Sequence, residues 1–225
     1  MIDRQTFVPR LDVLGAAQRH LWGRLSETSP TFVLYGGTAL ALRLGHRMSV
    51  DFDFFSSVGF HPDAIERQMS YLAGAERLQA QRDTLVALVA TPHGPVKVSY
   101  FGGLPLARVA PPEEVEPGGV RVASLTDLAA TKFKVVQDRA ELKDYQDMVA
   151  ILRAGLPLVT VARAALAVYR DALNPLISLK ALVYFDEGDV RGLDAEDRRV
   201  LTDAVRGVDP SALRPLEIDN RELSA

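Results

Sequence analysis

The sequence predicts an α+β fold, with a mixed β-sheet core in the first half of the chain and a helical lobe in the second. Short apolar or alternating segments typical of strands occur up to residue 101, whereas apolar residues recur at helical spacing after residue 124. A segment rich in proline and glutamate separates the two halves. We therefore expect a core at residues 1–104, a connection at 105–119 and a helical lobe at 120–225.

The composition is that of an ordinary globular protein of 225 residues, with 48% hydrophobic and 24% charged residues. The formal net charge of −3 gives no global basic field of the kind that indicates nucleic-acid binding. Because cysteine is absent, disulfides, thiolate metal sites and a thiol nucleophile are excluded. The sequence shows neither a signal peptide nor an apolar segment long enough to span a bilayer, so we expect a cytoplasmic protein with no membrane partner.

The first half is expected to alternate helices with strands. The boundaries follow from apolar periodicity and from the prolines and glycines that interrupt it. The expected elements are a helix at 9–27, a strand at 31–35, a helix at 38–45, a strand at 50–55, a helix at 62–73 and strands at 76–81, 84–91 and 96–101.

The second half is expected to be helical after a short edge strand at 120–122. Ser124 and Asp127 have the form of a capping box, which predicts a helix from 124 to about 137. A further helix is expected to continue to 153, followed by helices at 158–169, 175–184 and 194–205. Their apolar residues, which include Leu176 and Val183, are expected to pack into a small bundle.

Two acids alternate with two aromatic residues in the strand at 50–55. Strand side chains have a period of two, so Asp51 and Asp53 should emerge on one face while Phe52 and Phe54 anchor the other in the core. Two carboxylates on one face repel each other unless a cation or protons lie between them. Their oxygen atoms suit Mg²⁺, which also takes water and phosphate oxygens as ligands.

A pair of glycines, Gly36 and Gly37, precedes the short helix at 38–45. Glycines leave backbone amides uncovered at a helix start, where a phosphate can lie against the positive end of the helix dipole. A phosphate site close in sequence to a metal site indicates a nucleoside triphosphate.

These residues resemble a known family. The segment GGTALALRLGHRMSVDFDFF is similar to the signature of polymerase-β-like nucleotidyltransferases. It resembles more closely the AbiEii/AbiGii-type nucleotidyltransferase toxins of bacterial toxin–antitoxin and phage-defence systems. Their second signature, a helix lysine followed by Lys-Asp-x-x-Asp, is similar to DLAATKFKVVQDRAELKDYQD at 127–147. The resemblance extends from about residue 31 to about residue 152.

The resemblance implies transfer of a nucleoside monophosphate from an NTP to an acceptor hydroxyl on an RNA, such as a tRNA, or on a protein. It also implies a cognate antitoxin. Asp51 and Asp53 would bind Mg²⁺ or Mn²⁺ as metal ligands and catalytic residues. The residues that would bind the nucleotide are Gly36, Gly37, Thr38, Ser49, Arg43 or Arg47, Lys97 and Lys132.

In the second signature, Lys132 matches the family's helix lysine and would act as a cationic clamp on the triphosphate. Asp144 and Asp147 are three residues apart and share a helix face, and one of them would orient the acceptor or act as its base. Which of the two acids does so stays open.

The strand at 96–101 departs from the superfamily pattern. Members of the superfamily often carry another acid there, whereas the matching position holds Ser99, with Lys97 on the same face. Because serine is a weak metal ligand, a single Mg²⁺ is expected. Two alternatives stay open: a nucleotide-binding protein that has lost transfer chemistry, and a kinase-like phosphotransferase.

Overall fold

The computed structural model describes residues 6–116 and 119–223. The chain divides into two compact units. Unit 1 comprises Met1–Leu106, Pro111–Ser124 and Asn220–Ala225, and unit 2 comprises Ala107–Ala110 and Leu125–Asp219. The continuous boundaries at residues 104 and 119 stay a prediction.

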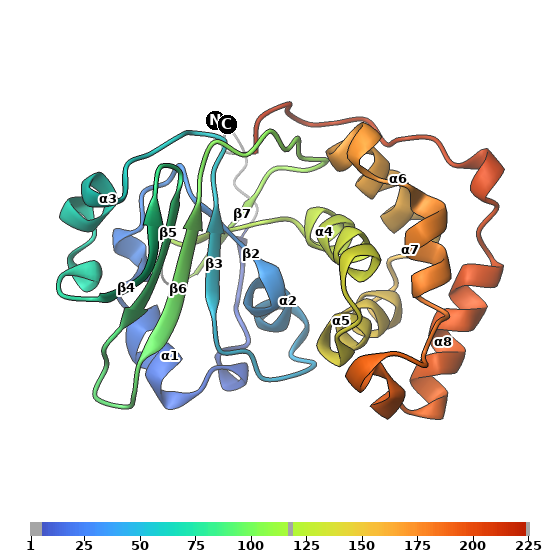
Figure 1. Cartoon of the computed structure of the whole chain (residues 1–225), viewed down its shortest axis with the longest axis horizontal. Coiled ribbons are helices and arrows are strands. Elements are labelled where there is room, and N and C mark those ends of the chain that lie inside the picture. Colours follow the sequence, from blue (N-terminus) through green and yellow to red (C-terminus); the bar gives the residue numbers. More distant parts are fainter. Residues whose placement is uncertain (1–5, 117–118, 224–225) are drawn as a thin grey trace. The chain divides into compact units, whose positions relative to one another are not determined.

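Unit 1 is built on a mixed sheet, which confirms the predicted α+β class. The strand order within the described ranges is β1-β7-β8-β2-β3-β6-β5-β4. Strand β3 pairs with β2 in antiparallel and with β6 in parallel orientation, and β3 and β6 run side by side in Figure 1. The strands are β1 (Thr6–Phe7), β2 (Val33–Tyr35), β3 (Phe52–Phe55), β4 (Glu76–Gln81), β5 (Thr84–Val89), β6 (Val96–Phe101), β7 (Glu113–Val115) and β8 (Arg121–Val122).

Within the described residues, the α-helices of unit 1 are α1 (Ala16–Trp22), α2 (Gly36–Leu44) and α3 (Pro62–Gln68). Helix α1 contributes Trp22, whose ring lies 6.1 Å from that of Phe52 on β3. Phe54 stacks on Tyr100 of β6 at 5.2 Å. The core of unit 1 therefore lies against the apolar face of β3.

Unit 2 is helical, as predicted. Helix α4 packs against α5, α6 and α7, and α8 packs against α5. The helices are α4 (Leu125–Asp138), α5 (Leu142–Arg153), α6 (Leu158–Tyr169), α7 (Pro175–Ala181) and α8 (Ala195–Arg206). The prediction that Leu176 and Val183 pack into the bundle is wrong, because their side chains are 47% and 37% exposed.

The prediction of a continuous helix at 9–27 is also wrong. Helix α1 is flanked instead by the short 3₁₀ turns Leu11–Val13 and Leu25–Glu27. Leu14 adopts an extended conformation and bridges to Ser49, and Gly15 is extended too. Pairing with a distant segment thus overrides a local apolar pattern of helical spacing.

The proline-rich segment contains a strand where an irregular chain was expected. Strand β7 pairs with β1 and β8, and β8 lies between β7 and β2 instead of at an edge. These strands are only two or three residues long, so their pairing with distant partners, and not their own composition, forms them.

In the described part of the chain, no single helix is both long and apolar enough to cross a membrane. The helices at Leu142–Arg153 and Leu158–Ala172 meet the length and composition criteria only when taken together, across a bend of 117°.

Asp127, near the start of α4, anchors the segment at 107–110 to unit 2. Asp127 is 2% exposed, and its carboxylate accepts hydrogen bonds from the backbone amides of Val109, at 2.7 Å, and Ala110, at 3.1 Å. We expect Asp127→Ala to lower the free energy of unfolding by about 2 kcal/mol, because both amides lose a charged acceptor. Urea denaturation measures this loss.

The matched control is Asp138→Ala at the other end of α4. Asp138 is exposed and forms an i,i+4 ion pair with Lys134, so its removal is expected to cost about 0.5 kcal/mol or less. Equal losses in the two variants would contradict the anchoring role of Asp127.

Candidate functional site

Strand β3 carries Phe52 and Phe54 on one face and Asp53 on the other, as its sequence predicts. Phe52 and Phe54 are fully buried, whereas Asp53 is partly exposed on the other face. The strand begins at Phe52, so Asp51 immediately precedes it and is also partly exposed. Burial of each phenylalanine contributes about 1.5–3 kcal/mol, which exceeds a repulsion of about 1 kcal/mol between two solvated carboxylates. The apolar anchors therefore hold the acids together.

Gly36 and Gly37 start α2 immediately after β2. Gly36 has φ +75°, and a Cβ atom there would lie 2.8 Å from Oδ2 of Asp53. A Cβ atom on Gly37 would collide with the guanidinium of Arg47. Since amides in the first helical turn have no acceptor within the helix, the glycine pair presents donors beside one carboxylate and one cation.

Thr38 and Ser49 fix the backbone of Asp51. Both side chains are buried, and their hydroxyl oxygens lie 2.7 Å apart. Thr38 donates its only hydroxyl proton to the Asp51 carbonyl, so Ser49 must donate to Thr38. This chain of hydrogen bonds connects the first turn of α2 to the segment that carries the metal-ligand candidate.

Lys97 on β6 forms an ion pair with Asp51. Its Nζ lies 2.9 Å from Oδ2 of Asp51, and the two side chains are 40% and 37% exposed. The hydrogen bond to Asp51 raises the pKa of Lys97, with a further contribution from the charge of Asp53. Ser99, two residues later, is opposite Asp53 in the β3–β6 register and is 3% exposed. Lys97 and Ser99 thus share the acidic face, as expected.

The two arginine candidates are placed differently. The Arg43 side chain is 9% exposed and donates to Glu113 at 2.9 Å and to the Ala123 carbonyl at 2.6 Å, while its guanidinium lies 4.2 Å from the ring centre of Phe7. Arg43 therefore connects α2 to β1, β7 and the chain after β8. Arg47 lies beside Gly37, next to the glycine pair.

In unit 2, Lys132 lies between two buried acids. Lys132 is only 6% exposed, so it is not a solvated surface lysine. Its Nζ lies 2.7 Å from Oδ1 of Asp144 and 2.6 Å from Oδ2 of Asp147, and both acids have an exposure of 0%. The second signature therefore brings its three candidate residues into direct contact, from α4 and α5.

Arg139 completes this cluster, and we did not predict a role for it from the sequence. It donates to Asp144 at 2.7 Å from the turn between α4 and α5. The only available signal was its position five residues before Asp144. Burial raises the pKa of Asp144, but the hydrogen bond from Arg139 and the charge of Lys132 outweigh it, so the pKa is lowered overall. Asp144 is therefore suited to binding cations and is a weak proton acceptor.

The carboxylate oxygens of Asp51 and Asp53 are suitable ligands for one hard cation. Two carboxylates supply the oxygen ligands that Mg²⁺ prefers, and water and phosphate would complete the coordination. Within residues 6–116 and 119–223, no group of three or more His, Cys, Asp or Glu side chains is arranged to hold a metal ion. The two acids alone therefore do not form a closed protein site.

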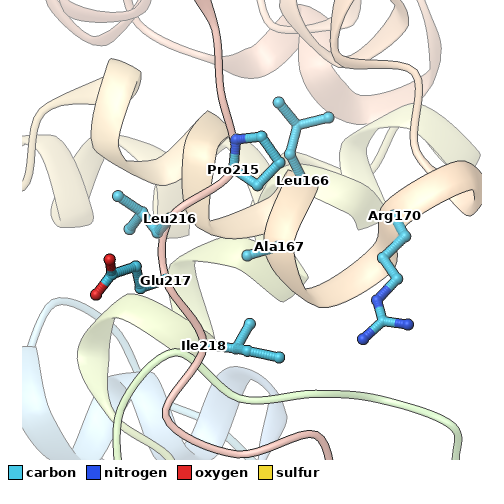
Figure 2. A pocket seen from close by; sticks show the side chains of 7 residues that line it. All are labelled: Leu166, Ala167, Arg170, Pro215, Leu216, Glu217 and Ile218. Atoms are coloured by element: carbon cyan, nitrogen blue, oxygen red, sulfur yellow. The ribbon is translucent and has the colours of Figure 1, made fainter.

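A cavity of about 520 Å³ lies in unit 2, near the end of α6. Figure 2 shows Arg170 and Glu217 on opposite sides of it, with Ala167 between them. None of the predicted site residues lines this cavity, which is bordered by Leu166, Ala167, Arg170, Pro215, Leu216, Glu217 and Ile218.

The buried contacts of Arg43 lead to a prediction. We expect Arg43→Ala to lower the free energy of unfolding by about 2–3 kcal/mol, since it removes several charged hydrogen bonds in a mostly buried site. Arg206→Ala, which removes an exposed arginine on α8 that pairs with Asp203, is expected to cost about 0.5 kcal/mol or less. Urea denaturation of both variants tests this difference, and an equal loss would contradict a structural role specific to Arg43.

From the lowered pKa of Asp144 we predict a dependence of stability on pH. Because the folded state lowers the pKa of Asp144, its contribution is complete above the unfolded pKa of ~3.9 and is lost as pH falls through the folded value. Asp144→Asn should have a lower melting temperature at pH 7 and a smaller decrease below about pH 4. Asp138→Asn, as the control, should follow the wild type. An acid dependence of Asp144→Asn as steep as that of the wild type would contradict the assignment.

Comparison with known sequences identifies a family. Residues 20–217 match the family profile described as "Nucleotidyl transferase AbiEii toxin, Type IV TA system". A protein of Aquifex aeolicus (strain VF5), described as uncharacterized, is 34% identical over 160 residues, which cover 69% of this chain and 74% of that protein.

Solved structures show the same fold. MenT4, a nucleotidyltransferase toxin from Mycobacterium tuberculosis H37Rv, superposes with a TM-score of 0.53 at 18% identity and covers 88% of this chain and 91% of its own. An antigenic nucleotidyltransferase-like protein from Paracoccidioides brasiliensis gives 0.55 at 14% identity, covering 93% and 96%. The predicted nucleotidyltransferase-like fold and the family resemblance are confirmed. The chain therefore belongs to the AbiEii family of nucleotidyltransferase toxins, and this membership implies an NTP substrate and an antitoxin partner.

Proposed function

We propose that Asp51 and Asp53 bind an NTP together with Mg²⁺ or Mn²⁺, and that the protein transfers its nucleoside monophosphate to an acceptor hydroxyl, releasing pyrophosphate. The observation that carries this proposal is the contact between the acidic face of β3 and the glycine start of α2, where Gly36 leaves room for the Asp53 carboxylate. When bound, the metal would offset negative charge on the phosphates in the transition state.

The chain's own groups position the triphosphate in this proposal. The amides of Gly36 and Gly37 donate to phosphate oxygens at the positive end of α2. Arg47 adds a cation beside them. Thr38 and Ser49 act indirectly, because their hydrogen bonds hold the backbone of Asp51 in place. Arg43, with its guanidinium bonded to β7 and to the chain after β8, serves the fold.

Lys132 is proposed to take part in the transfer as a cation. An ammonium has three N–H donors, and two of them suffice for Asp144 and Asp147, so one is left for a phosphate oxygen. Asp144 binds two cations and has a lowered pKa, so we assign it the positioning of Lys132. Asp147 is then the acid assigned to orient the acceptor hydroxyl or to act as its base.

The proposed acceptor is a hydroxyl of an RNA, such as a tRNA end, or of a protein side chain. The proposed setting is the cytoplasm, where NTPs and such acceptors occur together. The antitoxin would act against this transfer.

Labelled nucleotides test the reaction directly. The purified protein is incubated with Mg²⁺, total RNA or total protein, and each NTP labelled at the α- or the γ-phosphate. We expect the α-label to enter the acceptor and the γ-label to leave with pyrophosphate. Asp53→Asn and Lys132→Met should each lower the rate about 100-fold or more, as for the loss of a preorganised charge.

The control is Asp63→Asn, which changes an exposed acid on α3 that pairs with Arg77. This variant should retain the wild-type rate. Transfer of the γ-label would indicate a kinase-like phosphotransferase, and nucleotide binding without transfer of either label would indicate a pseudoenzyme. Either result contradicts the proposal.

A further inference from the structure

We propose that Lys97 takes the place of a second metal ion, so that the nucleotide site works with one divalent cation. The proposal rests on the function proposed above and specifies how the charge of the triphosphate is balanced. The observation behind it is the direct pairing of the Lys97 ammonium with a carboxylate of the acid pair.

The β3–β6 register determines which groups share this face. Phe52 is opposite Val98, and Asp53 is opposite Ser99. Lys97 precedes Ser99 by two residues and lies on the same face, with its Nζ 2.9 Å from Oδ2 of Asp51. The strand that borders the acids therefore contributes an ammonium and a hydroxyl, and no carboxylate, to the site.

The net charge of this arrangement equals that of a site with three carboxylates and two divalent ions. Two carboxylates, one ammonium and one divalent ion together carry a single positive charge. Three carboxylates with two divalent ions would carry the same charge. Replacing one carboxylate and one metal ion by Ser99 and Lys97 therefore leaves the net charge that faces the triphosphate unchanged.

A second divalent ion is disfavoured at this site for two reasons. Ser99 is a neutral hydroxyl, which offers a cation less than a carboxylate does. The Lys97 ammonium lies against Asp51 and would repel a further cation near that carboxylate. The site therefore has neither the ligand nor the negative charge that a second ion requires.

Lys97 is also placed to act on the substrate. Its ammonium has three donors, so it can keep Asp51 in position with one and reach a phosphate oxygen with another. The pair is partly exposed, at 40% for Lys97 and 37% for Asp51, so an incoming triphosphate has access to it. Lys97 thus acts as a positioning residue for Asp51 and as a permanent cation beside the phosphates.

Counting bound Mn²⁺ tests this proposal. The full-length protein is mixed with Mn²⁺ and an NTP analogue that has a methylene group between the α- and β-phosphates, for each of the four bases. Electron paramagnetic resonance measures the number of bound ions per chain and any magnetic coupling between them. We expect one uncoupled Mn²⁺ in the wild type and two coupled ions in the double variant Lys97→Met, Ser99→Asp.

A single variant shows what Lys97 alone contributes to ion number and to affinity. Lys97→Met should still bind one Mn²⁺, with an affinity for the analogue lowered about tenfold by the loss of one charged hydrogen bond. The control Lys134→Met changes a lysine on α4 that pairs with Asp138, and it should match the wild type in both number and affinity. Circular dichroism verifies that each variant is folded. If the double variant does not fold, the number of Mn²⁺ ions bound by the wild type decides between one ion and two.

Two coupled Mn²⁺ ions in the wild type would overturn the role of Lys97 while leaving the nucleotide site intact. The same conclusion follows if Lys97→Met binds the analogue as tightly as the wild type does. Absence of any analogue binding to the folded wild type would instead contradict the proposed function itself. The experiment therefore distinguishes the failure of this inference from the failure of the function on which it rests.

Discussion

Each unit places two carboxylates beside one lysine, and the repulsion between like charges is the constraint on which both arrangements depend. In unit 1, Lys97 pairs with Asp51. The hydrogen bonds of Thr38 and Ser49 hold the backbone of Asp51 just before β3. In unit 2, Lys132 contacts both Asp144 and Asp147. Carboxylates that share a site stay ionised together only when a cation offsets their repulsion. The lysines therefore explain how both acid pairs are tolerated.

The two clusters differ in exposure, and therefore in how easily their ion pairs can be rearranged by a ligand. The Asp51–Lys97 pair is partly exposed, and such a pair contributes only about 0.2–1 kcal/mol, so a metal and a triphosphate can rearrange it at little cost. Asp144 is fully buried, and removal of one partner from a buried pair costs about 3–5 kcal/mol. The unit 1 cluster is therefore suited to receiving ligand charges, whereas the unit 2 cluster is suited to holding Lys132 in a constant geometry.

Local periodicity was enough to predict the two faces of β3 and the location of Lys97 and Ser99 on the acidic face, because side chains two residues apart in a strand share a face. It failed where distant pairing decides: Leu14 is extended by its bridge to Ser49, and β7 forms inside a proline-rich segment. The contacts of Lys132 were likewise beyond pattern reading, because its partners lie on the next helix. The resemblance named these residues, but only the structure shows their mutual contacts and the addition of Arg139.

The metal requirement of triphosphate binding tests the central claim most directly. Calorimetric titration compares the wild type with the double variant Asp51→Asn, Asp53→Asn, each in Mg²⁺ and in EDTA. If the acids bind the triphosphate through a cation, the wild type will bind it tightly only with Mg²⁺. The neutral variant will lose that dependence and will bind the metal-free triphosphate better than the wild type does in EDTA, because two repelling carboxylates are gone. Equal affinity of the wild type in Mg²⁺ and in EDTA would contradict the account.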